Sequence, residues 1–390
     1  MMGPRRVWGG ERCHPPRRLL GTAAEGTTGA RISGAVHSGN AGRSAACRPA
    51  EYLTDALRRA GALGAGRVCD VVVESSKPTI LSRIIRLRLS YDGPAADASA
   101  SLILKTGLPE RADARRNPGQ YEVAFYTQVA AAIPEAPVPC CFDAVWNEDT
   151  NDWHLLLEDL TDSHFTLTYW PMPPTRPQSE AIVAARARFH AALWDDPRLG
   201  TSIGTWLEPH DPQIRRFAEE FARFADLVGD RLPAERRAVY ERLIEEGHRL
   251  NARYHTHRNM TLLHGDAHVW NVFLPRDGGD DVRLFDWPAW RINVATGDLA
   301  YMMALHWFPD HRRRYERHLL DHYHATLLAN GVSGYDRQAL DNDYCLSVLW
   351  QITIPVWQAA YNIPSGIWWH HLERIFLAID DLGCRDLLTV

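Results

Sequence analysis

The chain has 390 residues, of which 45% are hydrophobic and 10% aromatic, and its formal net charge is -5. This length and composition predict a globular protein of two or three domain-sized units with a buried core. The acidic balance argues against nucleic acid as the main partner, and no apolar run approaches the roughly 20 residues of a membrane helix.

The cysteines and the start of the chain bear on its compartment. The seven cysteines are scattered and include no C-x-x-C pair, which argues against a zinc site or a disulfide framework. No secretory apolar region lies near the N-terminus. We therefore expect a protein of the reducing cytoplasm, without a membrane partner, as a monomer or a homodimer.

Residues 1–48 differ from the rest of the chain in composition. They are rich in Gly, Arg, Ala and Pro, and residues 1–50 hold eight arginines against Glu11 and Glu25. Because they show no sustained hydrophobic period, residues 1–48 are expected to be a disordered tail. An Arg-rich start is also typical of a transit peptide, although no amphipathic helix supports one here. Translation from upstream of the natural start would account for the segment equally well.

Residues 49–160 have the pattern of a small β-rich lobe. A short helix is expected over 51–60 and another over 121–132, where apolar residues share one helical face. Apolar runs and near-alternation predict strands at 71–73, 84–90, 101–105 and 155–157, the first three of them antiparallel.

Residues 161–390 change to long helical segments, which predicts a larger, mainly helical lobe after a connector near residue 160. An interruption between 261 and 297 contains short apolar pairs that suit hairpin strands. The helices are expected at 179–194, 212–229, 233–257, 310–330, 336–360 and 366–382.

The segment 264–271 reads H-G-D-A-H-V-W-N and contains the strongest chemical signal. Phosphoryl transfer needs an acceptor hydroxyl aimed in line and metal ions that neutralise phosphate charge. Kinases supply these with an Asp five residues before an Asn and a second metal-binding Asp downstream. Asp266 and Asn271 have this spacing, and Asp286 supplies the third group.

At these residues the sequence resembles the aminoglycoside phosphotransferase and choline kinase-like family, whose loop reads H-G-D-x-x-x-x-N. Lys105 in L-I-L-K, Glu122 in Y-E-V-A-F-Y and L-E-D-L at 157–160 extend the likeness over roughly residues 68–380. The likeness is closest to the ecdysteroid kinase-like (CHK kinase-like) and bacterial small-molecule phosphotransferase branches. It implies an α+β, bilobal protein kinase-like fold, with a small antiparallel N-lobe and a mainly helical C-lobe.

The resemblance also implies roles for individual residues, with ATP and Mg²⁺ as cofactors. Asp266 would be the catalytic base or the carboxylate that orients the acceptor. Asn271 and Asp286 would bind magnesium. Lys105 would contact the α- and β-phosphates and pair with Glu122.

Five further residues receive roles around this centre. By the same resemblance, the hinge backbone at Glu158 and Leu160 would hold adenine, and Asp298 would brace the catalytic loop through its backbone. Ordinary helix capping is the other interpretation of Asp298. His264 is interpreted as a packing residue of the loop and His268 as a residue near the site.

The turn expected to cover the phosphates departs from the family pattern. The family's turn between the first two strands commonly contains glycine, whereas the turn expected here, at 74–80, has none. The hydroxyls of Ser75, Ser76 and Thr79 could still donate to phosphate oxygens, and Lys77 could add charge. The backbone should approach the phosphates less closely.

Two interpretations from other classes of function remain open. His264, Asp266 and His268 alternate, so in an extended segment they would share one face, as the ligands of a metal-dependent hydrolase do. The other histidines form no H-E-x-x-H pattern that would complete such a site. The glycine-free turn alone would suit a catalytically silent ATP-binding scaffold.

The acceptor is expected to be a small hydroxylated molecule. Only twelve steps separate Asp286 from Asp298, which is too few for the activation segment of a protein kinase. A biosynthetic or detoxifying metabolite kinase is the first interpretation. An aminoglycoside resistance kinase is the runner-up, with acids at 336, 341 and 343 as its candidate cation site. Tryptophans of the C-lobe, such as Trp350, could line an aromatic pocket, although core packing explains most of them.

Overall fold

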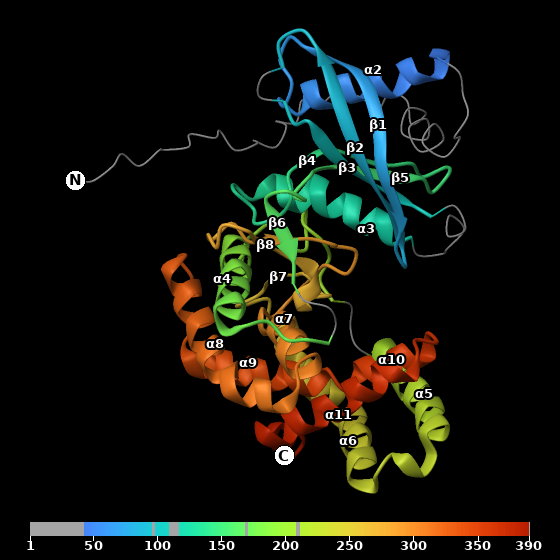
Figure 1. Cartoon of the computed structure of the whole chain (residues 1–390). Helices are drawn as coiled ribbons and strands as arrows, with labels where there is room; N and C mark the ends of the chain where they lie inside the picture. The colour runs from blue at the N-terminus through green and yellow to red at the C-terminus, as the bar shows by residue number, and fades with distance from the viewer. Residues whose placement is uncertain (1–42, 96–97, 109–116, 168–170, 208–210, 390) are drawn as a thin grey trace, which may run out of the picture. The chain divides into compact units, whose positions relative to one another are not determined.

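The computed structural model describes residues 43–95, 98–108, 117–167, 171–207 and 211–389. The chain divides into two compact units, Met1–Asp162 and Ser163–Val390 (Figure 1). Most of the segment predicted to be disordered, residues 1–42, lies outside the described part.

The N-terminal unit is built on one antiparallel sheet of five strands in the order β1-β2-β3-β5-β4. The strands are β1 (Arg67–Pro78), β2 (Ser82–Asp92), β3 (Ser101–Gly107), β4 (Cys141–Trp146) and β5 (Trp153–Glu158). The sheet contains the strands predicted from alternation, and β4 as well, which was not predicted.

Helix α2 (Arg43–Arg59) packs on one face of this sheet. Leu53 and Leu57 of α2 share a core with Leu102 and Leu104 of β3. The helix begins at Arg43, within the segment expected to be disordered and eight residues before its expected start. Because side chains alternate along a strand, Lys105 of β3 points to the face opposite Leu104.

Helix α3 (Pro118–Ala124) begins with strong capping signals. The Asn117 side chain accepts a hydrogen bond from the Gly119 amide, and a proline occupies the first turn. The helix continues as a π-helical turn (Phe125–Val129) and a short 3-10 turn (Ala130–Ala132). Gly119 lies so close to the Trp153 ring that a Cβ would overlap it.

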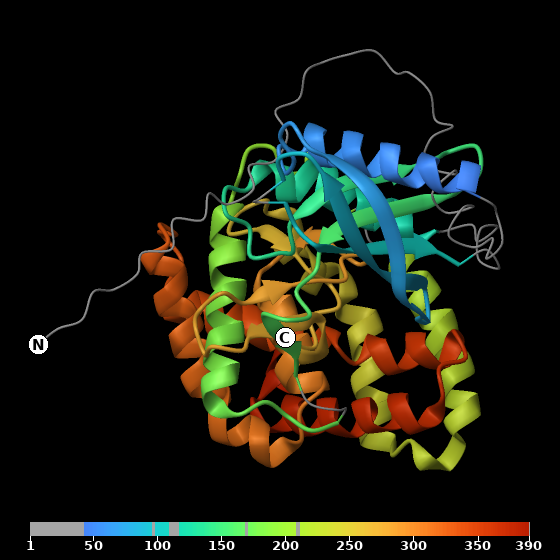
Figure 2. The ribbon, with the colours of Figure 1, turned by 45° about the horizontal axis from the view of Figure 1, so that its top comes forward.

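The C-terminal unit is mainly helical, and Figures 1 and 2 both show α4 and α8 side by side. Its helices are α4 (Arg176–Ala192), α5 (Asp211–Val228), α6 (Ala234–Asn251), α7 (Thr296–Ala300), α8 (Pro309–Ala329), α9 (Arg337–Trp350), α10 (Thr353–Ala360) and α11 (Ser365–Asp381). A π-helical turn (Tyr301–Leu305) follows α7, and short 3-10 turns lie at Gly229–Arg231, Ala252–His255, Val269–Asn271 and Cys384–Leu388.

The single helix predicted at 336–360 is wrong, because α9 ends at Trp350 and α10 begins at Thr353. Pro355 explains the break. A proline has no backbone N–H and its ring clashes with the carbonyl four residues earlier, here that of Gln351. Gln351 is the residue that caps α9.

Two small antiparallel sheets lie in the interruption between the helices. One has the order β6-β8-β9 and the other pairs β10 with β7. Their strands are β6 (His164–Thr166), β7 (Thr261–Leu263), β8 (Val272–Pro275), β9 (Arg283–Leu284) and β10 (Arg291–Asn293). These strands hold both ends of the segment 264–271.

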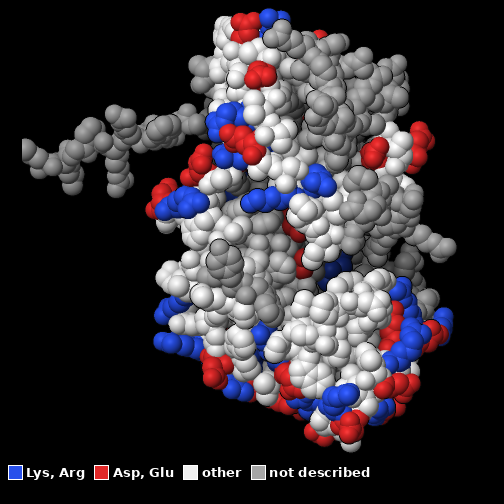
Figure 3. Space-filling view, turned by 45° about the vertical axis from the view of Figure 1, so that its right-hand side comes forward, with Lys and Arg blue, Asp and Glu red and all other residues white. Residues whose placement is uncertain are grey.

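The surface of the described residues carries charges of both signs. On the face seen in Figure 3, acidic and basic side chains lie next to one another over the lower part of the molecule instead of forming one patch of a single sign. Among the described helices, none is long and apolar enough to cross a membrane.

Replacing Gly119 by alanine should destabilise the protein, although alanine is the better helix former. The added methyl group would overlap the Trp153 ring, and overpacking of this kind costs about 1–3 kcal/mol. Urea unfolding followed by circular dichroism measures the change. Gly64→Ala is the control, because a Cβ at Gly64 would meet nothing within 4 Å. Equal stability of the two variants would contradict the expected packing.

Candidate active site

The loop after β7 turns sharply at Gly265, whose φ of +82° favours glycine. A Cβ at this position would also overlap the backbone oxygen of Ala289. The chain then passes through Asp266 into the 3-10 turn Val269–Asn271 and continues into β8. The glycine of the motif is therefore required by backbone geometry.

Asp298 in the first turn of α7 fixes the backbone of this loop. Its side chain is only 2% exposed. One carboxylate oxygen accepts a hydrogen bond from the His264 amide at 2.9 Å, and the other accepts one from the Gly265 amide at 3.0 Å. These two bonds hold the segment immediately before Asp266.

A histidine and an arginine of α4 lie beside the buried carboxylate of Asp298. His190 Nε2 lies 3.3 Å from its carboxylate and Arg186 Nη1 lies 3.6 Å from it. Burial acts to raise the pKa of Asp298, but the hydrogen bond from His190 and the nearby positive charges lower it far below its usual value. Arg186 also donates to the backbone oxygen of Ala267 at 2.7 Å, so α4 supports the loop at a second point.

The Asp266 carboxylate is held in one orientation and remains 33% exposed. Tyr301 donates its hydroxyl to Oδ1 at 2.7 Å, and Asn271 donates its amide nitrogen to Oδ2 at 3.1 Å. Burial and the neighbouring Asp266 charge raise the pKa of Tyr301, so its hydroxyl stays protonated and acts as the donor. Each Asp266 oxygen keeps a further lone pair for another partner.

Asn271 and Asp286 come from neighbouring points of the β8–β9 pair. The Phe285 amide donates to the backbone oxygen of Asn271 at 3.1 Å, so Asp286 follows the residue bonded to Asn271. Because Asp266 uses the Asn271 amide nitrogen, the side-chain oxygen is the atom left for a ligand. Asp286 has φ of +68°, a conformation that costs energy in a non-glycine residue and is common at functional sites.

The structure places His264 and His268 in different surroundings. His264 is buried against Trp287 at a ring distance of 4.3 Å, and its Nε2 donates to the Phe285 backbone oxygen at 2.9 Å. Burial lowers the pKa of His264 to about 4. His268 is partly exposed, with Nε2 at 3.6 Å from Asp266 Oδ2.

This arrangement does not support the hydrolase alternative. The segment after β7 is not extended, so the alternation of His264, Asp266 and His268 does not place them on one face. The described residues contain no group of three or more His, Cys, Asp and Glu side chains that could hold a metal ion.

In the N-terminal unit, Lys105 and Glu122 form a buried ion pair. Lys105 on β3 is 8% exposed and Glu122 on α3 is 3% exposed. Lys105 Nζ lies 2.7 Å from both Glu122 oxygens. Because an unpaired buried charge is strongly destabilising, the two side chains depend on each other for their placement.

The turn predicted at 74–80 is placed wrongly. Strand β1 continues to Pro78, so Ser75 and Ser76 lie within the strand and pair with Arg86 and Ile85. The turn itself contains only residues 79–81, and it is still free of glycine. Its backbone closes through bonds between Thr79 and Ser82, and the Thr79 hydroxyl accepts from the Ser82 amide at 3.0 Å.

The segment after β5 is anchored by a charged residue next to the predicted adenine hinge. Glu158 ends β5 and accepts from the Cys140 amide at 2.8 Å, and Leu160 is buried. Between them, Asp159 pairs with Arg86 at 2.6 Å. Burial acts to raise the pKa of Asp159, but hydrogen bonds, including that from Arg86, lower it to about 2.

Sequence reasoning missed three residues of the loop's surroundings. Tyr301, Arg186 and His190 had no assigned role, although each contacts Asp266, Ala267 or Asp298. The sequence contained a signal for two of these residues, namely their spacing. Arg186 and His190 lie four residues apart and so share one face of α4.

Comparison with known proteins identifies the family. The chain matches the ecdysteroid kinase-like family over residues 79–331, which is more than half of its length. The chain therefore belongs to the ecdysteroid kinase-like family. No curated protein matches it.

Solved structures share its fold. One is a protein from Ralstonia eutropha JMP134 classed with the aminoglycoside phosphotransferases, with 15% identity and a TM-score of 0.53, covering 86% of this chain and 98% of the other. Another is a microcompartment-associated aminopropanol kinase, with 12% identity and a TM-score of 0.50, covering 86% and 97%. The bilobal protein kinase-like fold expected from the sequence is confirmed.

Acidification should weaken the protein through its buried histidines. His371 packs on His306 at a ring distance of 4.6 Å, and burial lowers the pKa of His371 to about 4. An unfolded histidine titrates near 6.5, so between these values the unfolded chain binds more protons. The free energy of unfolding should therefore fall as pH decreases, by up to about 1.4 kcal/mol per pH unit for this residue.

Urea unfolding at a series of pH values from 7 to 4 tests this expectation. His371→Gln should flatten the dependence relative to the wild type. His322→Gln, on α8, is the control and should leave the slope unchanged. An unaltered slope in His371→Gln would contradict the assignment.

Proposed function

We propose that this chain is an ATP-dependent phosphotransferase that moves the γ-phosphate of ATP to a hydroxyl of a small molecule. The observation that carries the proposal is the Asp266 carboxylate, oriented by Asn271 and Tyr301 and still exposed to a ligand. The family and the names of two proteins of like fold, an aminoglycoside phosphotransferase and an aminopropanol kinase, support it.

Asp266 acts on the acceptor in this proposal. A free lone pair on its carboxylate accepts the hydrogen bond of the acceptor hydroxyl and points the oxygen at the phosphorus. The acceptor oxygen bonds to phosphorus, the bond to the bridging oxygen of ADP breaks, and the hydroxyl proton passes to Asp266. The two donors on Asp266 keep the carboxylate from rotating away.

The donor set at Asn271 and Asp286 fits Mg²⁺, which prefers oxygen ligands. Asn271 would offer its side-chain oxygen and Asp286 its carboxylate. When bound, Mg²⁺ neutralises phosphate charge. In the N-terminal unit, Lys105 would contact the phosphates while Glu122 holds it in place, and the backbone at Glu158 and Leu160 would hold adenine.

The residues near β1 and the loop take smaller parts in the proposal. Ser75 and Ser76 would reach the phosphates from the end of β1 rather than from a turn. Asp298 would keep the loop in shape, and His268 would lie beside the acceptor.

The alternative of a catalytically silent scaffold predicts nucleotide binding without turnover on any acceptor. Assays of ATP binding and of turnover therefore distinguish it from the proposed kinase.

The resistance-kinase alternative loses its candidate cation site. Asp336 caps α9 by accepting from the Ala339 amide, Asp341 pairs with Arg337, and Asp343 pairs with Arg253. Each of these carboxylates has a structural partner. A metabolite kinase therefore remains the proposed function.

Asp266→Asn should lower turnover by about 10² or more while ATP still binds, because it removes the proton acceptor of the reaction. ADP release over a panel of amino alcohols, aminoglycosides, nucleosides and steroid alcohols measures turnover, and calorimetry measures ATP binding. Asp310→Asn changes a fully exposed carboxylate to an amide and should have no effect. Turnover of Asp266→Asn near the wild-type value would refute the proposal.

Asp286→Ala should weaken ATP binding in the presence of Mg²⁺ by about tenfold or more and leave metal-free binding unchanged, because it removes a metal ligand. Calorimetry with and without Mg²⁺ measures both affinities. Asp277→Ala, an exposed residue after β8, is the control. If Asp286→Ala binds ATP as tightly as the wild type, the metal lies elsewhere.

A further inference from the structure

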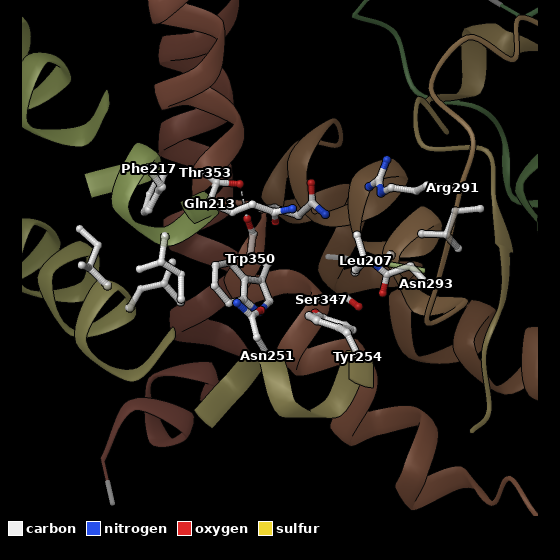
Figure 4. A pocket seen from close by; sticks show the side chains of 16 residues that line it. Leu207, Gln213, Phe217, Asn251, Tyr254, Arg291, Asn293, Ser347, Trp350 and Thr353 are labelled. Atoms are coloured by element: carbon white, nitrogen blue, oxygen red, sulfur yellow. Dashed lines mark hydrogen bonds between the residues drawn. The ribbon is translucent and has the colours of Figure 1, made fainter. Parts of the chain in front are cut away.

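The C-terminal unit contains a cavity of about 270 Å³ beside the strands that lead to Asp266. Its walls come from α5, α6, α9 and the β7–β10 pair (Figure 4). At about 30 Å³ for each water in the liquid, it has room for about nine waters. A small metabolite fits a space of this size.

Arg291 places a positive charge at the end of the cavity nearest the catalytic loop. It begins β10 and pairs with Leu263, the last residue before that loop. A Cβ on Gly265 would lie 2.6 Å from Arg291 Nη1, so the guanidinium lies directly beside the residue that precedes Asp266.

The Arg291 side chain is exposed, and no carboxylate of the described residues pairs with it. Arg291 donates one long hydrogen bond, 3.4 Å, to the backbone oxygen of Ala289. A guanidinium has five N–H donors and binds carboxylates through two parallel hydrogen bonds. Most of the N–H donors of Arg291 are therefore open to a ligand.

Two of the lining residues carry buried polar atoms without hydrogen-bond partners. Gln351 is 8% exposed, and its side-chain oxygen has no hydrogen-bond partner among the described residues. The indole nitrogen of Trp350 also has none. Both atoms have almost no accessible surface, so they lie behind the cavity wall and are not open to a ligand in the cavity.

The other end of the cavity is apolar. Figure 4 shows Phe217 at the side opposite Arg291, with the Trp350 ring between them. Ile214 and Leu243 also line the cavity. The lining residues that the structure describes include neither aspartate nor glutamate, so the fixed charge of the cavity is positive.

We propose that this cavity binds the acceptor and that the acceptor is a hydroxylated carboxylic acid with an apolar or aromatic body. Its carboxylate pairs with Arg291, its body lies along Trp350 towards Phe217, and its hydroxyl, a few bonds from the carboxylate, lies at the Asp266 end. That the ligand is the phosphate acceptor rests on the proposed kinase function. Binding of the ligand to the cavity does not require turnover.

Binding of matched ligands to the full chain, without nucleotide, tests the assignment by calorimetry. The probes are phenyllactate, lactate and β-hydroxyoctanoate, each with its primary amide and the corresponding amino alcohol. At least one acid should bind about tenfold or more tightly than its amide, because a hydrogen bond to a charged group is the stronger one. The amino alcohols should bind most weakly.

Arg291→Gln should remove the preference for the acid while leaving binding of the amide unchanged. Arg317→Gln, an exposed arginine on α8, is the control and should preserve the preference. The proposal fails if no acid is preferred over its amide in the wild type. It also fails if Arg291→Gln weakens acid and amide alike, since Arg291 would then shape the cavity or serve the phosphates.

Turnover separates this proposal from the proposed function. If the acids bind through Arg291 but none is phosphorylated in the ADP-release assay, the ligand class stands and the kinase function falls. If amino alcohols or steroid alcohols are phosphorylated and the acids neither bind nor react, the kinase function stands and the ligand class falls.

Discussion

The buried carboxylate of Asp298 is the interaction on which the candidate site depends. A charge removed from water must be paired and hydrogen-bonded, or it destabilises the fold by several kcal/mol. Asp298 meets this requirement through two loop amides and the side chains of Arg186 and His190 on α4. The same bonds that stabilise the charge therefore fix the loop that presents Asp266.

One short segment both supports and orients the loop. Asp298 holds the backbone of the loop. Tyr301 lies three residues later, nearly one helical turn on, and donates a hydrogen bond to the Asp266 carboxylate. Any shift of this segment would move both contacts together. The hydrogen bonds from Tyr301 and Asn271 together hold the Asp266 carboxylate in one orientation.

The sequence was informative where chemistry is local. The spacing of Asp266, Asn271 and Asp286 and the alternation of the strands could be recognised because neighbouring residues determine them. Tyr301 could not, because its partner is 35 residues away and a tyrosine in an apolar helix has the same pattern as a core residue. The turn after β1 was misplaced because Ser and Lys in an exposed edge strand give no apolar period.

The acids found in the sequence were a poor guide to the charge of a site. Asp336, Asp341 and Asp343 were candidates for binding a cationic acceptor, but they serve capping and ion pairs. The cavity wall that the structure describes carries Arg291 instead. Local pairing decides which charges remain for a ligand, and pairing is a property of the fold.

The closed turn at residues 79–81 has a mechanical consequence. A glycine-rich turn can fold over a ligand by rotating a few backbone bonds. In this turn the Thr79 hydroxyl accepts a hydrogen bond from the Ser82 amide, and Ile80 adds a bulky exposed side chain. If phosphates bind under this turn, their exchange would require the two-stranded ribbon formed by β1 and β2 to bend. Because β1 is the edge of its sheet, no further strand of the described residues pairs with the outer side of this ribbon.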